Sequence, residues 1–569
     1  MGKVVNTEAY LEPLKYYEHS LKEDHLENVS NYIDELAKES GVNIDENAET
    51  CKKVYQEENK LKHVSSLLGR AKAGFVIFLI LFILSLVGAV ICFFLASSNP
   101  SSVGMFIGIG IGALALAGLS FYLFFFLFRK KKKALAEEKA KLEAKVNELK
   151  QEAWNQMAPL NAKFNSLMAP RLFTKSAPLI EFDDMLSSQV EERIVNQFED
   201  KLDDSIDRST MVVQSGHINT NPFILRQVLK MHMEDYTYTG TLVITYTKTV
   251  SDGNGGTTTT TVTQTLVAHV VRPKPYYGIE TTLTYYSDFA EKLSFSRTPA
   301  GLVGKDKKAI DKIAEKRSKA DTKKAEQAVR KGEEYMKFAN SKFEVYFNCN
   351  NRDDEHGYRS LFTPLAQENL CYNFSKVDDI YYTKKKCANI IYSNHDKGKD
   401  YSGDPTNYYH FDFEVIKKNF INYNTTFFDG IYMDFVPLLS IPAFHENASA
   451  PYKATTKEPL SLYEAEAMVN KFDPNLFKAP NCDTDVILKV APTGKNIMVT
   501  AHGFHADPRV ETVPVIGGDG RTHLVPVHYY EYLRVQNTQL VNASEGEAKV
   551  LDKDSGSVIN YKLFNAKVN

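Results

Sequence analysis

Two long apolar runs constrain the fold of this chain more than any other feature. Residues 73–96 and 103–128 contain no charged side chain, and each run exceeds the roughly 20 residues that a helix needs to cross a bilayer. The connection between them, SSNPSS at 97–102, is short and uncharged and contains a proline. The sequence therefore predicts a transmembrane helical hairpin over residues 71–128, with spans at 73–96 and 103–128.

Basic residues next to the two runs predict how the hairpin is oriented. Lys and Arg collect in the segments that stay on the cytoplasmic side of a membrane. The basic residues are Lys60, Lys62, Arg70 and Lys72 before the first run, and Arg129, Lys130, Lys131, Lys132 and Lys133 after the second. We therefore expect both termini in the cytoplasm and the hairpin in the plasma membrane, in contact with membrane lipid. The second group is interpreted as a membrane-flanking anchor, with recognition of anionic lipid as the alternative.

Small residues recur at helical spacing in both runs. Gly104, Gly108 and Gly112 lie in the second run, and Ser85 and Ala89 lie in the first. Such stripes let helix backbones approach closely, so they predict packing within the hairpin or a contact between copies in a homo-oligomer. An oligomeric transport or channel subunit is one function that the second possibility allows. Neither run contains an ionisable group of the kind that lines ion pathways, which speaks against a pore.

The segments on either side of the hairpin are predicted to be helical and cytosolic. They are residues 1–70, with helices at 8–39 and 45–70, and a juxtamembrane helix over 129–170 that continues the second run. The stripe on the second segment consists of Leu142, Val146, Leu149 and Ala153. This spacing indicates either a coiled coil or docking of the helix on the N-terminal helices.

From residue 171 to residue 302 the pattern changes to the alternation of β-strands, most clearly in a hairpin over 236–271. One face carries Tyr236, Tyr238, Leu242, Ile244 and Tyr246 in the first strand, and Val262, Leu266, Ala268 and Val270 in the second. Cross-strand neighbours share a face, so these apolar sets coincide only if the loop has an odd number of residues, such as Gly253-Asn254-Gly255. We expect a loop of three or five residues, a buried apolar face and a threonine-rich face in water.

Residues 303–340 are dense in both charges and predict a long exposed helix with a thin apolar stripe. Lys and Arg are in excess, which is compatible with nucleic acid or a membrane surface. Aromatic residues are not interleaved with them, so we interpret the helix as a solvated surface element. It separates the β-rich region from a second β-containing stretch that begins at Phe343. This stretch belongs to a second α+β region, 341–569, which is expected to end in antiparallel strands.

A third apolar stretch, 427–444, is interrupted by Asp429, Asp434, Pro437 and Pro442. Each carboxylate would cost about 2.5–3.5 kcal/mol near the centre of a bilayer. We therefore predict a buried segment of a soluble unit rather than a third span.

The order of these segments, together with Phe343-Glu344-Val345-Tyr346-Phe347 and Leu361-Phe362-Thr363-Pro364 followed by a short helix, resembles a known group of proteins. It is similar to an uncharacterised family of bacterial two-span membrane proteins, a domain of unknown function. The resemblance covers residues 70–375 in layout, and the charged helix departs from it. It implies a bacterial membrane protein and carries no catalytic residues over to this chain.

Gly517-Gly518-Asp519-Gly520 resembles the phosphate-binding loop of NAD kinases and diacylglycerol kinases. In those enzymes the loop opens a helix whose N-terminal amides hold phosphate. Here strand alternation precedes the loop, and His523, Val525, Val527 and Tyr529 continue it afterwards. An Asp-Gly pair between alternating segments is a hairpin signal, so we predict a turn. Asp519 is a catalytic candidate only under the alternative that the chain is a hydrolase or phosphotransfer enzyme.

Four histidines are candidate metal ligands: His502, His505, His523 and His528. Side chains three or five residues apart on a strand point to opposite faces, so ordinary strand histidines are expected.

Asp353, Asp354 and His356, with Glu355, could serve acid–base chemistry. A polar loop that enters a helix has the same composition, because acids favour a helix N-terminus.

Composition sets the remaining limits. The 569 residues are 43% hydrophobic and 24% charged with a net charge of −3, which is typical of several folded units and gives no reason to expect a nucleic-acid partner. The six cysteines show no paired spacing, so reduced structural thiols are expected, with no zinc site and no cofactor.

Together these features predict an α+β membrane protein: a two-helix transmembrane hairpin with long helical extensions and a cytosolic, antiparallel, β-rich module. The predicted function is a membrane-anchored adaptor or scaffold that binds a protein partner or forms a homo-oligomer. A membrane-bound hydrolase or phosphotransfer enzyme is the first alternative, and a transport or channel subunit is the second.

Overall fold

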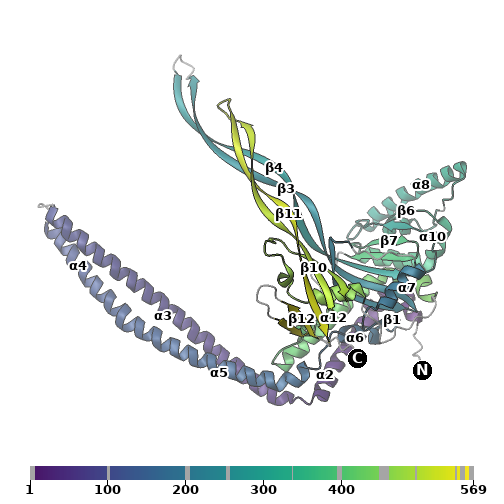
Figure 1. Ribbon diagram of the computed structural model, residues 1–569, viewed down its shortest axis with the longest axis horizontal. Helices are drawn as coiled ribbons and strands as arrows, with labels where there is room; N and C mark the ends of the chain where they lie inside the picture. Colours follow the sequence, from purple (N-terminus) through teal and green to yellow (C-terminus); the bar gives the residue numbers. More distant parts are fainter. Residues whose placement is uncertain are drawn as a thin grey trace. The chain divides into compact units, whose positions relative to one another are not determined.

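The computed structural model describes residues 7–98, 103–198, 205–251, 257–335, 337–393, 400–447, 461–493, 496–544, 547–551 and 558–562. The chain divides into two compact units (Figure 1). The helical unit consists of residues 30–164 and 405–423, and the α+β unit consists of residues 1–29, 165–404 and 424–569.

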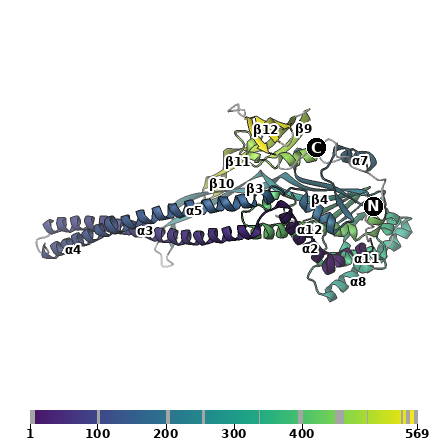
Figure 2. The same ribbon diagram turned by 90° about the horizontal axis from the view of Figure 1, so that it is seen from below.

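The helical unit is a hairpin of two very long helices, which lie side by side in both views (Figures 1 and 2). The first is α3 (Ile44–Ser98). The second consists of α4 (Val103–Tyr122), a π-helical turn (Leu123–Phe128) and α5 (Arg129–Asn161). Both are long and apolar enough to cross a membrane, and only 11% and 17% of their apolar windows are buried. Core helices of soluble proteins are mostly buried, so this exposure fits a lipid environment better than a soluble core.

The predicted continuation of the second span into a helix is confirmed, because helix runs from Val103 to Asn161. The helix predicted at 45–70 and the first apolar run, which were predicted as separate segments, form one continuous helix, since α3 has no break near residue 70. Of the two interpretations of the α5 stripe, docking is observed: Leu149 and Ala153 pack on Cys51 and Val54 of α3 and on Phe411. Lys145 and Lys150 of α5 also pair with acids of α3, with Nζ to carboxylate distances of 3.1 and 2.7 Å.

The α+β unit is organised around an 8-stranded antiparallel sheet in the order β1-β2-β3-β4-β8-β7-β5-β6. Its strands are β1 (Ile180–Phe182), β2 (Arg208–Ile218), β3 (Asn221–Ser251), β4 (Thr257–Tyr286), β5 (Phe295–Arg297), β6 (Cys349–Arg352), β7 (Tyr381–Lys385) and β8 (Ala388–Ser393). β4 pairs with β8 from Thr281↔Ser393 to Tyr286↔Ala388. Strands from both predicted β regions therefore belong to one sheet.

Short helices connect and cover these strands. They are α1 (Pro13–Tyr16), α6 (Met168–Ser176), α7 (Ser188–Phe198), α9 (Ser341–Phe347), α10 (Glu355–Leu361), α11 (Pro364–Lys376), α13 (Pro442–Glu446) and α14 (Leu462–Val469). α2 (Lys22–Ser40) and α12 (Phe413–Leu439) each contribute residues to both units. The β-containing stretch predicted to begin at Phe343 opens with α9, because Asn340 caps this segment by accepting from the amides of Lys342 and Phe343, and its first strand is β6.

Aromatic residues of α12 form the centre of the α+β unit. Phe428, Tyr432 and Phe435 are fully buried, and Phe428 and Phe435 contact Phe173 at centroid distances of 4.8 and 6.4 Å. Asp429 is satisfied by the Tyr17 hydroxyl at 2.6 Å and by Lys22 at 3.2 Å. The prediction that residues 427–444 form a buried segment of a folded unit is therefore confirmed.

Two long hairpins extend from the unit as stacked ribbons (Figure 1), which we call the arm. One hairpin is β3–β4, with strands of 31 and 30 residues. The other is β10 (Asn496–Ile516) with β11 (Thr522–Ser544), part of a 5-stranded sheet that also contains β9 (Ile487–Thr493), β12 (Glu547–Leu551) and β13 (Val558–Lys562). Tyr246 lies opposite Val262, which is the register that an odd loop requires. The predicted register is confirmed, although the loop itself, residues 252–256, is outside the described residues.

The apolar faces of the two ribbons bury each other. Ile244, Leu266, Ala268 and Val270 of the first ribbon form a cluster with Val525 and Val527 of the second. The Gln264 side chain also accepts a hydrogen bond of 2.7 Å from the Gly518 amide. The arm is therefore a two-layer structure with its own small core, so each ribbon supports the other.

The charged helix is shorter than predicted. α8 spans Lys307–Lys331 and ends where Gly332 takes a left-handed conformation with φ of 71°. Ile310, Ala314 and Ala328 form its buried side. Glycine favours this backbone conformation at a helix C-terminus, so the helix stops there rather than near residue 340.

Candidate functional site

A polar pocket of about 690 Å³ lies beside the C-terminal half of α8. Its walls come from α8, from the segment after it, and from β5, β6 and β7. Charged side chains of both signs line it, among them Lys324, Lys331 and Glu333. Its walls come from chain segments that are far apart in the sequence, and for this reason no local motif could have predicted it.

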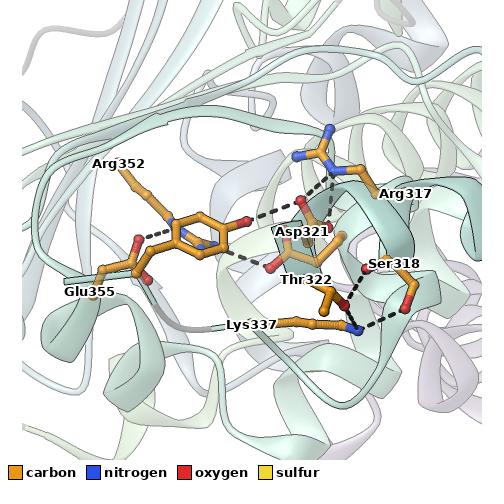
Figure 3. Close-up of polar contacts among 9 residues, drawn as sticks. Arg317, Ser318, Asp321, Thr322, Lys337, Arg352 and Glu355 are labelled. Atoms are coloured by element: carbon orange, nitrogen blue, oxygen red, sulfur yellow. Dashed lines mark hydrogen bonds and ion pairs between the residues drawn. The ribbon is translucent and has the colours of Figure 1, made fainter. Parts of the chain in front are cut away.

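The Arg352 guanidinium is the centre of the polar network in one wall (Figure 3). It donates to Glu355 at 2.6 Å and to Glu344 at 3.1 Å. It also lies 4.6 Å from the ring centroids of both Tyr335 and Tyr358. Burial raises the pKa of Glu344, and the charge of Arg352 opposes that effect. The Arg352 guanidinium and the two carboxylates are paired with each other, so they stabilise the pocket wall rather than offer a reactive group.

A second set of contacts fixes the segment that follows α8 (Figure 3). Asp321 of α8 accepts from the Tyr335 hydroxyl at 3.0 Å and from Arg317 at 3.2 Å. Lys337 donates to Ser318 at 2.8 Å and to Thr322 at 2.9 Å. These bonds fold the chain back on α8 and shape the mouth of the pocket.

Lys384 and Cys349 carry a buried amine and a buried thiol in the pocket wall, and the chemistry of both groups includes nucleophilic attack. Lys384 is 1% exposed, its ammonium donates to the Lys386 carbonyl, and burial lowers its pKa to about 8. Burial raises the pKa of the Cys349 thiol to about 11, so little thiolate forms at neutral pH. The pocket can hold a small polar molecule. Among the described residues that line it, no nucleophile is paired with a general base.

The acidic candidates near the pocket have structural partners. Asp354 caps α10 and accepts from the Gly357 amide at 3.0 Å. Asp353 accepts from the Ser294 amide at 2.6 Å. The imidazole of His356 is 70% exposed and lies 3.6 Å from Glu334. The three side chains serve separate contacts, as expected for a polar loop that enters a helix.

Asp519 lies in the turn between β10 and β11, so the predicted hairpin is confirmed. Its carboxylate accepts from the Arg521 amide at 3.1 Å and contacts His523 Nε2 at 3.1 Å. The hydrogen bond from the Arg521 amide lowers the pKa of Asp519, and His523 adds to this effect. No helix follows the turn, since β11 begins at Thr522. The loop therefore lacks the helix N-terminus that holds phosphate in the kinases it resembles.

The four histidine candidates for a metal site are not gathered at one place. His523 contacts Asp519, and His505 contacts Asp483 at 2.7 Å. β10 and β11 pair without a register shift, so His502 and His505, like His523 and His528, face opposite sides. Within the described part of the chain, no group of three His, Cys, Asp or Glu side chains is arranged to hold a metal ion.

The small residues of the apolar helices divide into two groups. Ser85 and Ala89 are buried in the hairpin. A Cβ atom added at Gly104, Gly108 or Gly112 would meet nothing within 4 Å, whereas one at Gly110 would lie 3.1 Å from the Phe93 ring. Gly104, Gly108 and Gly112 therefore face away from the packed side of the hairpin, whereas Gly110 packs against Phe93 on another face of α4. The basic residues Arg129–Lys133 open α5, where Arg129 and Lys132 lie over the rings of Phe125 and Phe75.

Comparison of the chain with models of protein families, with characterised proteins and with solved structures finds no match. The motifs behind the bacterial-family resemblance have local structural roles instead. Phe343 and Phe347 are core residues of α9, and Thr363 caps α11 through the Ala366 amide.

Proposed function

We propose that the protein is a membrane-anchored adaptor whose arm binds a protein partner by strand addition. The observation that carries this proposal is the exposed edge of the β3–β4 ribbon. β2 pairs with β3 only at residues 221–230, and β8 pairs with β4 only at residues 281–286. Beyond these points, the two strands pair only with each other within the described part of the chain. Unpaired strand edges present rows of N–H and C=O groups that template pairing with another strand.

The two ribbons of the arm differ in how their edges are protected. Pro508, Pro514 and Pro526 lie in the β10–β11 ribbon, together with charged residues such as Arg509 and Glu511. Between Tyr236 and Ser251 the only charged side chain is Lys248, and residues 257–271 contain no charged residue and no proline. Proline and charge are the usual means by which proteins block edge pairing. Their near absence from residues 236–251 and 257–271, the outer part of β3–β4, supports this part of the ribbon as the one that accepts a strand; Arg272, Pro273, Lys274 and Pro275 of β4 lie outside it.

The outward face of the β3–β4 ribbon supports the same conclusion. Thr241 lies opposite Val267, Val243 lies opposite Thr265, and Thr245 lies opposite Thr263. Val243 is 63% exposed and Val267 is 45% exposed, although larger apolar side chains fill the inward face. β-Branched residues favour extended backbone and pack well across strands. This face therefore suits a further strand of uncharged, β-branched character.

The membrane anchor is the second part of the proposal. The two apolar helices provide it, and the basic residues at Arg70, Lys72 and Arg129–Lys133 support cytoplasmic termini and a plasma-membrane location. Protease added to intact cells should then leave the α+β unit uncut, and cleavage of that unit would reverse the proposed orientation.

An enzymatic function has less support. The acidic candidates Asp353, Asp354 and Asp519 each accept backbone hydrogen bonds at a cap or turn. Burial leaves the Cys349 thiol in the pocket with a raised pKa, the opposite of nucleophile activation. The alternative of a hydrolase or phosphotransfer enzyme therefore lacks the paired groups that such chemistry needs.

The test introduces a photo-crosslinking residue at Thr245, on the outward face of β3, in cells that make the full chain. We expect a specific cross-linked product. Val243→Lys with Val267→Lys should abolish it, because charge on this face opposes strand addition. The matched control places the same two lysines on the other ribbon, as Val510→Lys with Leu524→Lys at positions 56% and 61% exposed. The product should persist there. If no product forms, or if it survives both pairs equally, the proposed binding surface is wrong.

A further inference from the structure

The outward face of α8 carries a stripe of basic side chains that the proposed adaptor function does not use. Ile310, Ala314, Asp321 and Ala328 form the buried side of the helix. At 100° per residue, the basic residues on the opposite side fall within one narrow sector. They are Lys308, Lys312, Lys316, Lys319, Lys323 and Arg330, all exposed.

The acids of α8 do not neutralise this stripe. Asp311 pairs with Lys342 at 2.8 Å, and Asp321 pairs with Arg317 at 3.2 Å, both away from the stripe. Glu315 pairs with Lys319 at 2.7 Å, and Glu326 falls at the same angle around the helix as Lys308, so these two acids offset only part of the charge of the stripe. In the described part of the chain, no carboxylate forms an ion pair with Lys308, Lys312, Lys316, Lys323 or Arg330. The stripe therefore keeps a net positive charge and is about 33 Å long at 1.5 Å per residue.

We propose that this stripe binds the anionic surface of a phospholipid bilayer, as a second membrane contact of the same chain. Clusters of Lys and Arg on one helix face are attracted to anionic lipid, by about fivefold in apparent affinity for each basic side chain near the surface. The two apolar helices support this choice of partner, because a chain anchored in a bilayer faces that surface at high effective concentration.

Nucleic acid is a weaker candidate for the same charge. Single-stranded nucleic acids are held by aromatic side chains that stack on bases, together with basic grooves. No aromatic residue is present in α8 from Lys307 to Lys331. The net charge of the whole chain is −3, so the chain as a whole adds no long-range attraction for phosphate backbones.

The test uses the full-length protein in proteoliposomes that contain a trace of photoactivatable lipid. Adducts on residues 307–331 are measured by mass spectrometry relative to adducts on the apolar helices, which serve as the internal reference. We expect α8 adducts in bilayers of phosphatidylcholine with phosphatidylglycerol. They should be lost in pure phosphatidylcholine, and reduced by high salt because exposed charges are screened.

Charge-reversal variants identify the face. Lys312→Glu, Lys316→Glu and Lys323→Glu together should lower the α8 adduct ratio by about tenfold or more. The matched control reverses three exposed lysines of the same helix that lie off the stripe: Lys307→Glu, Lys324→Glu and Lys331→Glu. It has the same net charge and should retain most of the adducts.

Three results would overturn the proposal. Adducts that do not depend on phosphatidylglycerol would mean that the stripe is only a solvated surface. Equal losses in the two triple variants would mean that bulk charge, and not this face, is responsible. Protection of α8 by a short DNA duplex in pure phosphatidylcholine, without any effect of anionic lipid, would assign the face to nucleic acid. The adaptor proposal is tested separately, because none of these substitutions touches the arm.

Discussion

The imidazole of His25 stacks on the ring of Phe428, with centroids 3.9 Å apart and an angle of 13° between the planes. Its Nε2 donates to the Asn424 carbonyl at 3.2 Å, and Nδ1 lies 2.8 Å from the Ser176 hydroxyl. The residue is 2% exposed. Burial therefore lowers the pKa of His25 to about 4, because a charged ring would lose its hydration beside an aromatic neighbour.

This pKa predicts how stability depends on pH. The folded-state pKa of His25 lies below the usual value of about 6.5, so the unfolded chain binds the proton more tightly between those two values. The contribution of neutral His25 is fully present above about pH 6.5 and is lost as the pH falls toward 4, by on the order of 3 kcal/mol.

The measurement is heat unfolding of detergent-solubilised protein across this pH range for the native chain and for His25→Gln. Gln can donate to the Asn424 carbonyl but does not titrate, so its loss of stability on acidification should be smaller. Hydrogen exchange at the imidazole C2 position, followed by mass spectrometry, gives the pKa of His25 directly. A pKa near 6.5 in the folded protein would show that this explanation is wrong.

Gly240 controls the distance between the two ribbons of the arm. A Cβ atom at this position would lie 2.2 Å from the Pro526 carbonyl oxygen, which belongs to the backbone of β11. Gly240→Ala should therefore push the ribbons apart and destabilise the arm by about 1–3 kcal/mol. Faster amide exchange across residues 522–530 would report this separation.

Gly278 on β4 provides the matched control, since an added Cβ would meet nothing within 4 Å. Gly278→Ala should leave exchange in β11 unchanged, because it adds the same methyl group to the same hairpin without a clash. Equal exchange rates in the two variants would show that close packing at Gly240 does not hold the ribbons together.

Asn47 fastens residues 411–413 to α3 within the helical unit. Its amide donates to the Phe411 carbonyl at 2.9 Å and its side-chain oxygen accepts from the Phe413 amide at 3.1 Å. Asn47 is 1% exposed, so Asn47→Ala would leave both backbone groups buried without these partners. We expect a loss of about 2–4 kcal/mol and faster amide exchange at residues 410–414.

Tyr55→Phe is the comparison for this site. It removes only the 2.6 Å hydrogen bond from the Tyr55 hydroxyl to Asp412, and Tyr55 is 39% exposed. Water can replace this bond, so the loss should be about 1 kcal/mol. If both variants lose the same stability, burial does not set the strength of this contact.

The sequence predicted the features that depend on periodicity. Alternation along residues 236–271 gave the buried face of β3–β4, and face matching gave the register that places Tyr246 opposite Val262. The same logic identified the turn at Asp519. In both cases the apolar residues of two neighbouring strands have to share one face, so the local sequence is sufficient to predict how the strands pair.

Features built from distant segments were not predictable. The pocket beside α8 combines residues near 295, 324, 352 and 384, and no local sequence pattern predicts that these segments lie together. One signal was present: Lys384 shares the core-facing side of β7 with Tyr382, where a strand pattern demands an apolar residue. The N-cap at Asn340 starts α9 at Ser341, so the β-containing stretch predicted from Phe343 begins with a helix that its apolar pattern did not predict.

The apolar hairpin offers a prediction that separates packing within one chain from contacts between chains. Gly110→Leu should strain the contact with the Phe93 ring, because even a Cβ atom would lie 3.1 Å from it. We expect this variant to lower thermal stability in detergent by about 1–3 kcal/mol.

Gly108→Leu is the comparison. Its side chain projects into space with no atom within 4 Å of the Cβ position, so the isolated chain should tolerate it. Any change in oligomeric mass with Gly108→Leu would then report a contact between chains along the glycine stripe. If Gly108→Leu destabilises a chain that is monomeric in detergent as much as Gly110→Leu does, the packing of α4 against α3 differs from that described above.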